Sequence, residues 1–333
     1  MKRTPLLLLL FLLLAAMVLV LPVGRYPLDF GLLLEAVGNR LAGLPLGQTE
    51  DQLLFVFFQV RLPRILAALL VGSSLCVSGT VYQNMFFNPL VSPGILGVLA
   101  GASFGAALGI VVFSSWTMTQ VLSFVGGGLG VGLSLFFASI YPKARMLALI
   151  VGGLVSSSFF TALASILKYV ADPNRQLPEL VYWLMGTLSR ADGPQLLWAA
   201  PLMGAGLLYL CLGGKVLNAL SQGDEEARSL GIESGRARII FIGVATLICS
   251  LTVVLAGVIN WVGLVVPHVM RFIVGPDNRV LLPASALGGA LFVLLTDTLV
   301  RSVWTVELPL GIVTSVIAMP IFALSLWFDW RRQ

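Results

Sequence analysis

Long apolar runs recur along almost the whole chain and are separated by short polar connections. A helix crosses a bilayer with roughly 17–25 mostly apolar residues, and most of the runs are of that length. The pattern predicts ten spans, at residues 5–23, 64–83, 93–113, 118–139, 146–168, 194–213, 238–258, 262–275, 282–302 and 309–328. The eighth run is too short for a full crossing, so we interpret it as a half-helix buried among its neighbours. We therefore expect an all-α polytopic membrane protein in which residues 1–333 form one transmembrane domain.

The first run shares one feature with signal peptides, because Lys2 and Arg3 precede it. Its apolar stretch from Leu6 to Leu21 is longer than the apolar region of most signal peptides, and no clear cleavage site follows. We interpret it as a retained first span.

Three segments between the spans are long enough to form structure of their own. Apolar residues recur at helical spacing over 29–44, which predicts an amphipathic helix within the loop 24–60. The loop 214–237 is polar, has acidic residues near its middle, and contains a Leu230–Gly231 pair that is typical of a helix end. Within 178–192, apolar and aromatic residues predict a short helix that lies in the membrane interface.

The composition agrees with a membrane solvent. Hydrophobic residues make up 58% of the chain and charged residues only 11%, whereas about a quarter of a soluble domain is charged. The net charge of +5 does not indicate nucleic-acid binding, because the basic residues are scattered singly between apolar runs.

The basic residues instead predict the orientation of the chain in the membrane. Ten spans place both termini on one face, and that face collects twelve of the 20 Lys and Arg residues, against eight on the other. Cytoplasmic loops carry the excess of basic residues in membrane proteins. We therefore expect both termini in the cytoplasm.

Candidates for covalent chemistry are few. His268 is the only histidine and has no metal-ligand partners nearby in sequence, so we interpret it as a structural residue. The three cysteines lie in apolar runs without metal-ligand spacing, and no phosphate-binding loop occurs. Asp297 precedes Arg301 by four residues, so the two share a helix face and can pair. Because acids are otherwise scarce in the spans, the sequence argues against an ion-coupled transporter, and it offers no catalytic residue and no metal site.

Three arginines lie on the face where the orientation rule does not expect them. Arg61 and Arg64 flank the start of the second span, and Arg301 ends the ninth. They either anchor helix ends at the interface or form an exposed patch that docks an acidic partner, since arginine makes bidentate contacts with carboxylates.

The stretch from Asn88 to Gly94 contains two prolines and cannot be a continuous helix. It is either an ordinary turn or part of a gate, because non-helical backbone near a membrane must be shielded by protein or line a cavity.

Several ordered motifs together resemble the FecCD/BtuC-type permease family, the membrane subunits of type II ABC importers for iron–siderophores, haem and cobalamin. The resemblance covers essentially the whole chain beyond the first span. The motifs are Arg61-Leu-Pro-Arg64-Ile-Leu-Ala, Gly72 to Gln83, Asn88-Pro89-Leu90, Pro93 to Gly97, Gly223 to Gly231, Gly263 to Arg271, Asn278 to Pro283, Asp297 to Arg301 and Glu307 to Thr314.

The resemblance implies ten spans per subunit, a homodimer with the pathway between its copies, two cytoplasmic ATPase subunits and an external binding protein. Position by position it assigns three roles to this sequence. Docking of the binding protein goes to Arg61, Arg64 and Arg301. Coupling to the ATPase goes to Gly223, Asp224, Glu225, Ala227, Leu230 and Gly231, and a cytoplasmic gate goes to Asn88, Leu90, Pro142, Lys143 and Ala144, although this chain has Pro142 and Lys143 where the family commonly has polar residues.

The expected function is therefore the permease subunit of a bacterial inner-membrane ABC importer. It takes up an iron–siderophore, haem or cobalamin by alternating access, and ATP and Mg²⁺ bind to the separate ATPase rather than to this chain. An oxyanion such as molybdate is the alternative cargo, and an ion-coupled secondary transporter is the alternative class.

Overall fold

The computed structural model describes the chain except for residues 1–2, 25, 27–28, 141–144, 304–305 and 331–333. All regular secondary structure in the described residues is helical. The elements are α1 (Arg3–Val20), α2 (Phe30–Leu41), α3 (Gln48–Phe55), a π-helical turn η1 (Val56–Arg61), α4 (Leu62–Met85), a 3₁₀ turn η2 (Pro93–Leu96), α5 (Val98–Leu108), a π-helical turn η3 (Gly109–Phe113), α6 (Trp116–Ile140), α7 (Arg145–Val170), α8 (Gln176–Leu184), α9 (Gly193–Leu212), α10 (Gly214–Leu220), α11 (Asp224–Ser229), α12 (Ser234–Ala256), α13 (Val262–Val274), α14 (Asn278–Val303) and α15 (Leu310–Trp330).

Every predicted span coincides with an apolar helix. Within the described residues, six helices are long and apolar enough to cross a membrane, and four shorter apolar helices, at 4–20, 98–113, 262–274 and 310–325, occupy the other predicted spans. The eighth span is α13, of 13 residues, as short as its sequence indicated. The all-α polytopic fold is thus confirmed.

The loop 24–60 contains more helix than the sequence predicted. The amphipathic helix is present as α2, but α3, η1 and α4 then run on as one helix from Gln48 to Met85. Pro63 lacks the N–H that an α-helix needs, and the wider turn η1 comes directly before it. The first residues of this long helix are polar, so in the sequence they could not be told from a loop.

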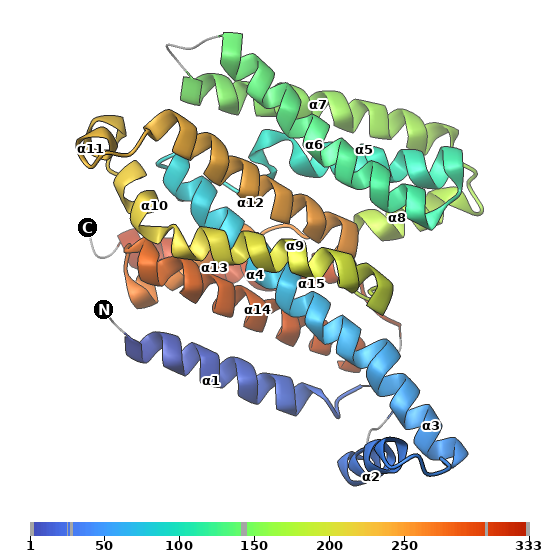
Figure 1. The fold of residues 1–333 in the computed structure, drawn as a ribbon. Coiled ribbons are helices and arrows are strands. Elements are labelled where there is room, and N and C mark those ends of the chain that lie inside the picture. Colours follow the sequence, from blue (N-terminus) through green and yellow to red (C-terminus); the bar gives the residue numbers. More distant parts are fainter. Residues whose placement is uncertain (1–2, 25, 27–28, 141–144, 304–305, 331–333) are drawn as a thin grey trace.

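Helix α4 lies at the centre of the bundle (Figure 1) and packs against α12, α13 and α14. Two of its glycines make these contacts close. A Cβ atom at Gly72 would overlap the backbone of Gly289 in α14, and one at Gly79 would overlap the backbone of Gly263 in α13. Small residues let helices approach in a membrane, where packing rather than water expulsion holds them together.

The short helix predicted within 178–192 exists as α8, and its apolar face packs into the bundle. Trp183 is only 5% exposed and Leu180 is fully buried, whereas Pro178 on the same helix is exposed. Its C-terminal turn is tied to the start of α15, because Leu310 N donates to Gly186 O at 2.8 Å and Gly311 N donates to Met185 O at 3.0 Å. Sequence spacing identified the apolar face without showing what covers it.

The two ends of the bundle carry different elements (Figure 1). The start of α1, the end of α15 and the short helices α10 and α11 lie at one end, while α2, α3 and α8 lie at the other. We call these the terminal end and the opposite end.

Replacing Gly79 by Ala should destabilise the bundle by about 1–3 kcal/mol, because the added methyl group forces α4 away from α13. Gly243 in α12 has open space around its Cβ position, so Gly243→Ala is the matched control and should leave stability unchanged or raise it. Thermal unfolding in detergent measures both. Equal melting temperatures for the two variants would contradict the close crossing.

Candidate functional site

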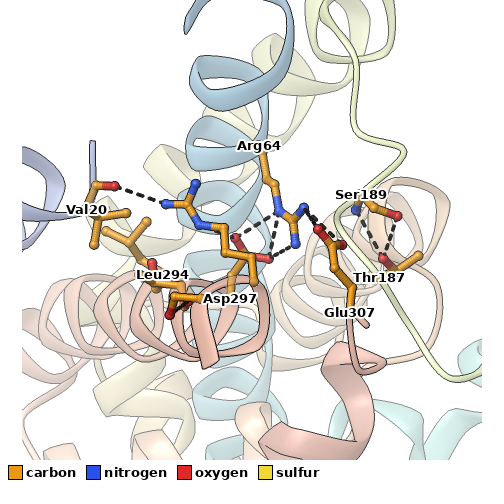
Figure 2. Close-up of polar contacts among 10 residues, drawn as sticks. Val20, Arg64, Thr187, Ser189, Leu294, Asp297 and Glu307 are labelled. Carbon is orange, nitrogen blue, oxygen red and sulfur yellow. Dashed lines mark hydrogen bonds and ion pairs between the residues drawn. The ribbon is translucent and has the colours of Figure 1, made fainter. Parts of the chain in front are cut away.

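Charged side chains gather at the opposite end of the bundle, near the start of α4, and Figure 2 shows Arg64, Asp297 and Glu307 among them. Arg64 is at their centre. Its Nε and Nη2 atoms donate to the carboxylate of Asp297 at 2.9–3.0 Å, and its Nη1 atom donates to both oxygens of Glu307 at 3.2 Å. One guanidinium therefore connects α4, α14 and the segment before α15.

The other two arginines of the cluster hold the end of α1. Arg301 donates to the carbonyl of Val20 at 3.1 Å, and Arg61 donates to the carbonyls of Leu21 and Tyr26. These carbonyls belong to the last turn of α1 and the segment after it, where backbone acceptors have no helical partner. The arginines thus bind the loop after α1 to the bundle.

The predicted ion pair of Asp297 with Arg301 within α14 is present, but its charged atoms lie farther apart than those of Asp297 and Arg64. Arg301 Nε lies 4.0 Å from an Asp297 oxygen, whereas Arg64 lies within 3.0 Å of the same carboxylate. Asp297 is only 2% exposed, so its charge needs a partner within the protein. The closer partner is Arg64 of α4, which is distant in sequence.

Arg61, Arg64 and Arg301 are 3%, 8% and 6% exposed, and the expectation that they form an exposed patch is wrong. The physical reason is that burying an arginine requires acceptors, and Asp297, Glu307 and the backbone after α1 supply them from elements far apart in sequence. Three arginines face two carboxylates in the cluster, which leaves one excess positive charge. Docking by these residues stays a prediction.

At the terminal end, the segment 214–237 forms two short helices, α10 and α11. Helix α11 begins after Gly223, carries acidic residues in its first turn, and ends at Leu230 and Gly231, as the sequence indicated. Leu230 is 62% exposed, whereas Ala227 is fully buried. The helix therefore presents an acidic start and an apolar end to its surroundings, and its role in coupling stays a prediction.

The turn after α4 is confirmed as non-helical backbone. Phe87 has a φ of 49°, and the Asn88 side chain accepts a hydrogen bond from Leu90 N at 2.9 Å. Asn88 and Leu90 are both exposed. The other predicted gate residues, Pro142, Lys143 and Ala144, lie outside the described residues. The gate itself stays a prediction.

A cavity of about 670 Å³ lies between this turn and the 214–237 segment. Its walls include Asn88 and Pro89 from the turn, Lys215 from α10, Leu230 from the end of α11 and Arg271 from α13. The structure thus brings Asn88 of the predicted gate and Leu230 of the predicted coupling residues to one hollow at the terminal end.

A network of side chains beside this hollow was missed by sequence reasoning. Asn84 and Asn278 exchange two hydrogen bonds of 3.1 Å, Asn218 donates to Asp277 at 2.7 Å, and Asn278 N donates to Asn218 at 2.8 Å. The hydrogen bonds from Arg279 and Asn218 hold the pKa of Asp277 well below its usual range. The network joins the ends of α4, α10 and α14. The signal in the sequence for this network is an asparagine at the end of an apolar span, such as Asn84.

His268 is buried among aromatic rings, with ring centroids 5.2 Å from Phe272 and 5.6 Å from Phe322. Among the described residues, no group of three or more His, Cys, Asp or Glu side chains is placed to hold a metal ion.

Comparison with known proteins agrees with this architecture. The model of the FecCD transport family matches residues 9–328. The chain is 36% identical over 313 residues to the molybdate import system permease protein MolB of Haemophilus influenzae, covering 93% of this chain and 91% of that protein. It is 34% identical to the hemin transport system permease protein HmuU of Yersinia pestis, over 86% of each chain. A solved metal-chelate type ABC transporter in an inward-facing conformation has a TM-score of 0.85 and 34% identity, covering 97% of this chain and 98% of that one.

The bundle is that of an ABC importer permease, a multi-pass membrane subunit that works with ATPase and binding-protein partners. The chain belongs to the FecCD transport family.

Replacing Asp297 by Asn should destabilise the protein by about 3–5 kcal/mol, because it leaves the buried Arg64 without its main counter-charge at nearly constant volume. Glu179 and Arg190 form an exposed pair at 3.1 Å, so Glu179→Gln is the matched control and should cost at most about 1 kcal/mol. Chemical unfolding in detergent distinguishes the two. Equal losses of unfolding free energy in the two variants would mean that the pair of Arg64 with Asp297 is no stronger than a surface ion pair.

Proposed function

We propose that this permease imports an iron–siderophore or a related metal chelate, such as haem or cobalamin, across the bacterial inner membrane by alternating access. The observation that carries the proposal is the match, over nearly the full length of both chains, to a metal-chelate type ABC transporter. The similarity to HmuU supports the same class of cargo.

The working unit in this proposal is a homodimer of the permease with two cytoplasmic ATPase subunits and an external binding protein. ATP and Mg²⁺ bind to the ATPase subunits, and this chain needs no cofactor, performs no covalent chemistry and binds no nucleic acid. A single transmembrane domain, 1–333, carries both the docking and the coupling surfaces.

The proposed orientation places the terminal end in the cytoplasm. Twelve basic residues lie on that side in our assignment, against eight on the other. This orientation turns α10 and α11 toward the ATPase subunits, with the exposed Leu230 among the surface contacts.

Molybdate is the second candidate cargo, because the chain is 36% identical to MolB over nearly its whole length. An ion-coupled mechanism has less support. A proton or sodium relay needs acids that are available to the ion, whereas the carboxylate of Asp297 is engaged by Arg64.

Docking of the binding protein is assigned to the arginine cluster in this proposal. The one excess positive charge of the cluster attracts acidic residues, and arginine pairs well with carboxylates. Because the arginines are buried, the cluster acts through its field or after a local opening rather than as a ready-made exposed patch.

Deletion of the gene for this permease in its native cells should abolish uptake of one of four labelled cargoes: a ferric siderophore, haem, cobalamin or molybdate. Uptake should stop when ATP is depleted and persist when only the proton gradient is collapsed. Molybdate as the lost cargo would favour the second candidate. Uptake that follows the proton gradient would contradict the importer.

The docking role is tested best at Arg61, which bonds to backbone carbonyls and has no direct carboxylate partner among its described hydrogen bonds. Arg61→Gln should weaken binding of the cognate binding protein about tenfold, as loss of one charge contact of about 1.4 kcal/mol would, and should lower its salt dependence. Arg61→Lys is the control that keeps the charge. Binding by the Gln variant that equals wild type would show that Arg61 only anchors the loop after α1.

A further inference from the structure

Arg238, near the start of α12, contacts three separate segments with one guanidinium group. Its Nε atom donates to Asp224 at 3.0 Å, its Nη1 atom to the carbonyl of Met85 at 3.1 Å, and its Nη2 atom to the carbonyl of Leu220 at 3.1 Å. The guanidinium carbon also lies 5.3 Å from the centroid of the Phe87 ring. No part of the function described so far uses this residue.

Each partner of Arg238 stands at the end of an element. Asp224 is the first residue of α11, Leu220 the last of α10, and Met85 the last of α4. Two residues separate Met85 from Asn88, where the candidate gate turn begins. The guanidinium therefore connects α10 and α11 to the last residue of α4, directly before the candidate gate turn.

Phe87 is held in a conformation that a large side chain rarely adopts. Its φ of 49° lies in the left-handed region, which is unfavourable for a residue other than glycine. Its ring is 54% exposed, yet it lines two hollows, the one of about 670 Å³ beside Asn88 and another of about 390 Å³ that Asp224 and Arg238 also line. Arg238, over the ring, helps to keep this backbone in place.

The network around Arg238 runs from the surface to the interior. The Asp224 side chain is 53% exposed and that of Arg238 only 15%. A partner that contacts the start of α11 can thus reach Asp224, whereas the two carbonyl contacts lie deeper. The planar guanidinium holds its donors at fixed angles, so α11 cannot move relative to α4 without carrying Met85 along or breaking a contact.

We propose that Arg238 is the positioning residue that transmits movement of α11 to the turn at Phe87 and Asn88. The proposal rests on the proposed function, in which α11 contacts the ATPase. Movement of α11 on nucleotide binding shifts Asp224, the guanidinium follows, and the end of α4 with its turn moves from one arrangement to the other.

The test uses the complete importer in proteoliposomes, with uptake and ATP hydrolysis measured in the same vesicles. Arg238→Gln should keep hydrolysis near the wild-type rate but lower the cargo taken up per ATP about tenfold, because the charge-assisted hydrogen bonds that link α11 to the end of α4 are lost. Arg236, two residues earlier and exposed, provides the control, and Arg236→Gln should retain the wild-type ratio. The uptake per ATP of Arg238→Lys should lie between those of the wild type and Arg238→Gln, because lysine keeps the positive charge but lacks the planar guanidinium.

Asp224→Asn provides a second, milder test, because it weakens the exposed contact and leaves the carbonyl contacts of Arg238 intact. It should lower the uptake per ATP, and combining it with Arg238→Gln should add little further loss, since both changes interrupt the same path. Asp224→Asn decides the question if Arg238→Gln fails to assemble.

A wild-type ratio of uptake to hydrolysis in Arg238→Gln or, where that variant does not assemble, in Asp224→Asn would overturn the proposal. That result differs from failure of the proposed function, in which the wild-type importer itself would show no ATP-dependent uptake.

Discussion

The close contact of α4 with α13 and α14 is the constraint on which the rest of the structure depends. Glycines at the two crossings let the backbones touch, and no side chain lies between them to rearrange. Such contacts do not deform gradually, because a packed interior has few voids into which atoms can move. Helix α4 is therefore the central axis of the bundle, held close to its neighbours at both crossings.

An arginine stands at each end of this axis. At the opposite end, Arg64 of α4 is held by Asp297 and Glu307, while at the terminal end Arg238 of α12 binds the last carbonyl of α4. The first contact ties α4 to α14 and the start of α15. The second ties it to α10 and α11, the segment assigned to coupling. The two charged junctions thus lie where the proposed partners would act, and α4 runs between them.

Sequence reasoning went furthest where the signal was local. Run lengths located all ten apolar helices, and the Leu230–Gly231 pair marked the end of α11. The partners of Arg64 come from residues more than 230 positions away, so no local pattern could show that this cation is buried. The start of α3 was missed because its polar residues match a loop as well as a helix that extends beyond the bundle. The family resemblance supplied candidate roles but not the contacts, and Arg238 lies outside the residues to which it assigned a role.

The buried arginines also limit which conformations the protein can occupy. A guanidinium that loses its acceptors in a medium of low polarity retains an uncompensated charge, which costs several kcal/mol. An arrangement that separates Arg64 from both Asp297 and Glu307 is therefore unfavourable. The proposed alternating access must either keep these pairs or give the guanidinium equally good acceptors. Charged groups in this chain thus have a structural role, because the pairs of Arg64 connect elements that lie far apart in the sequence.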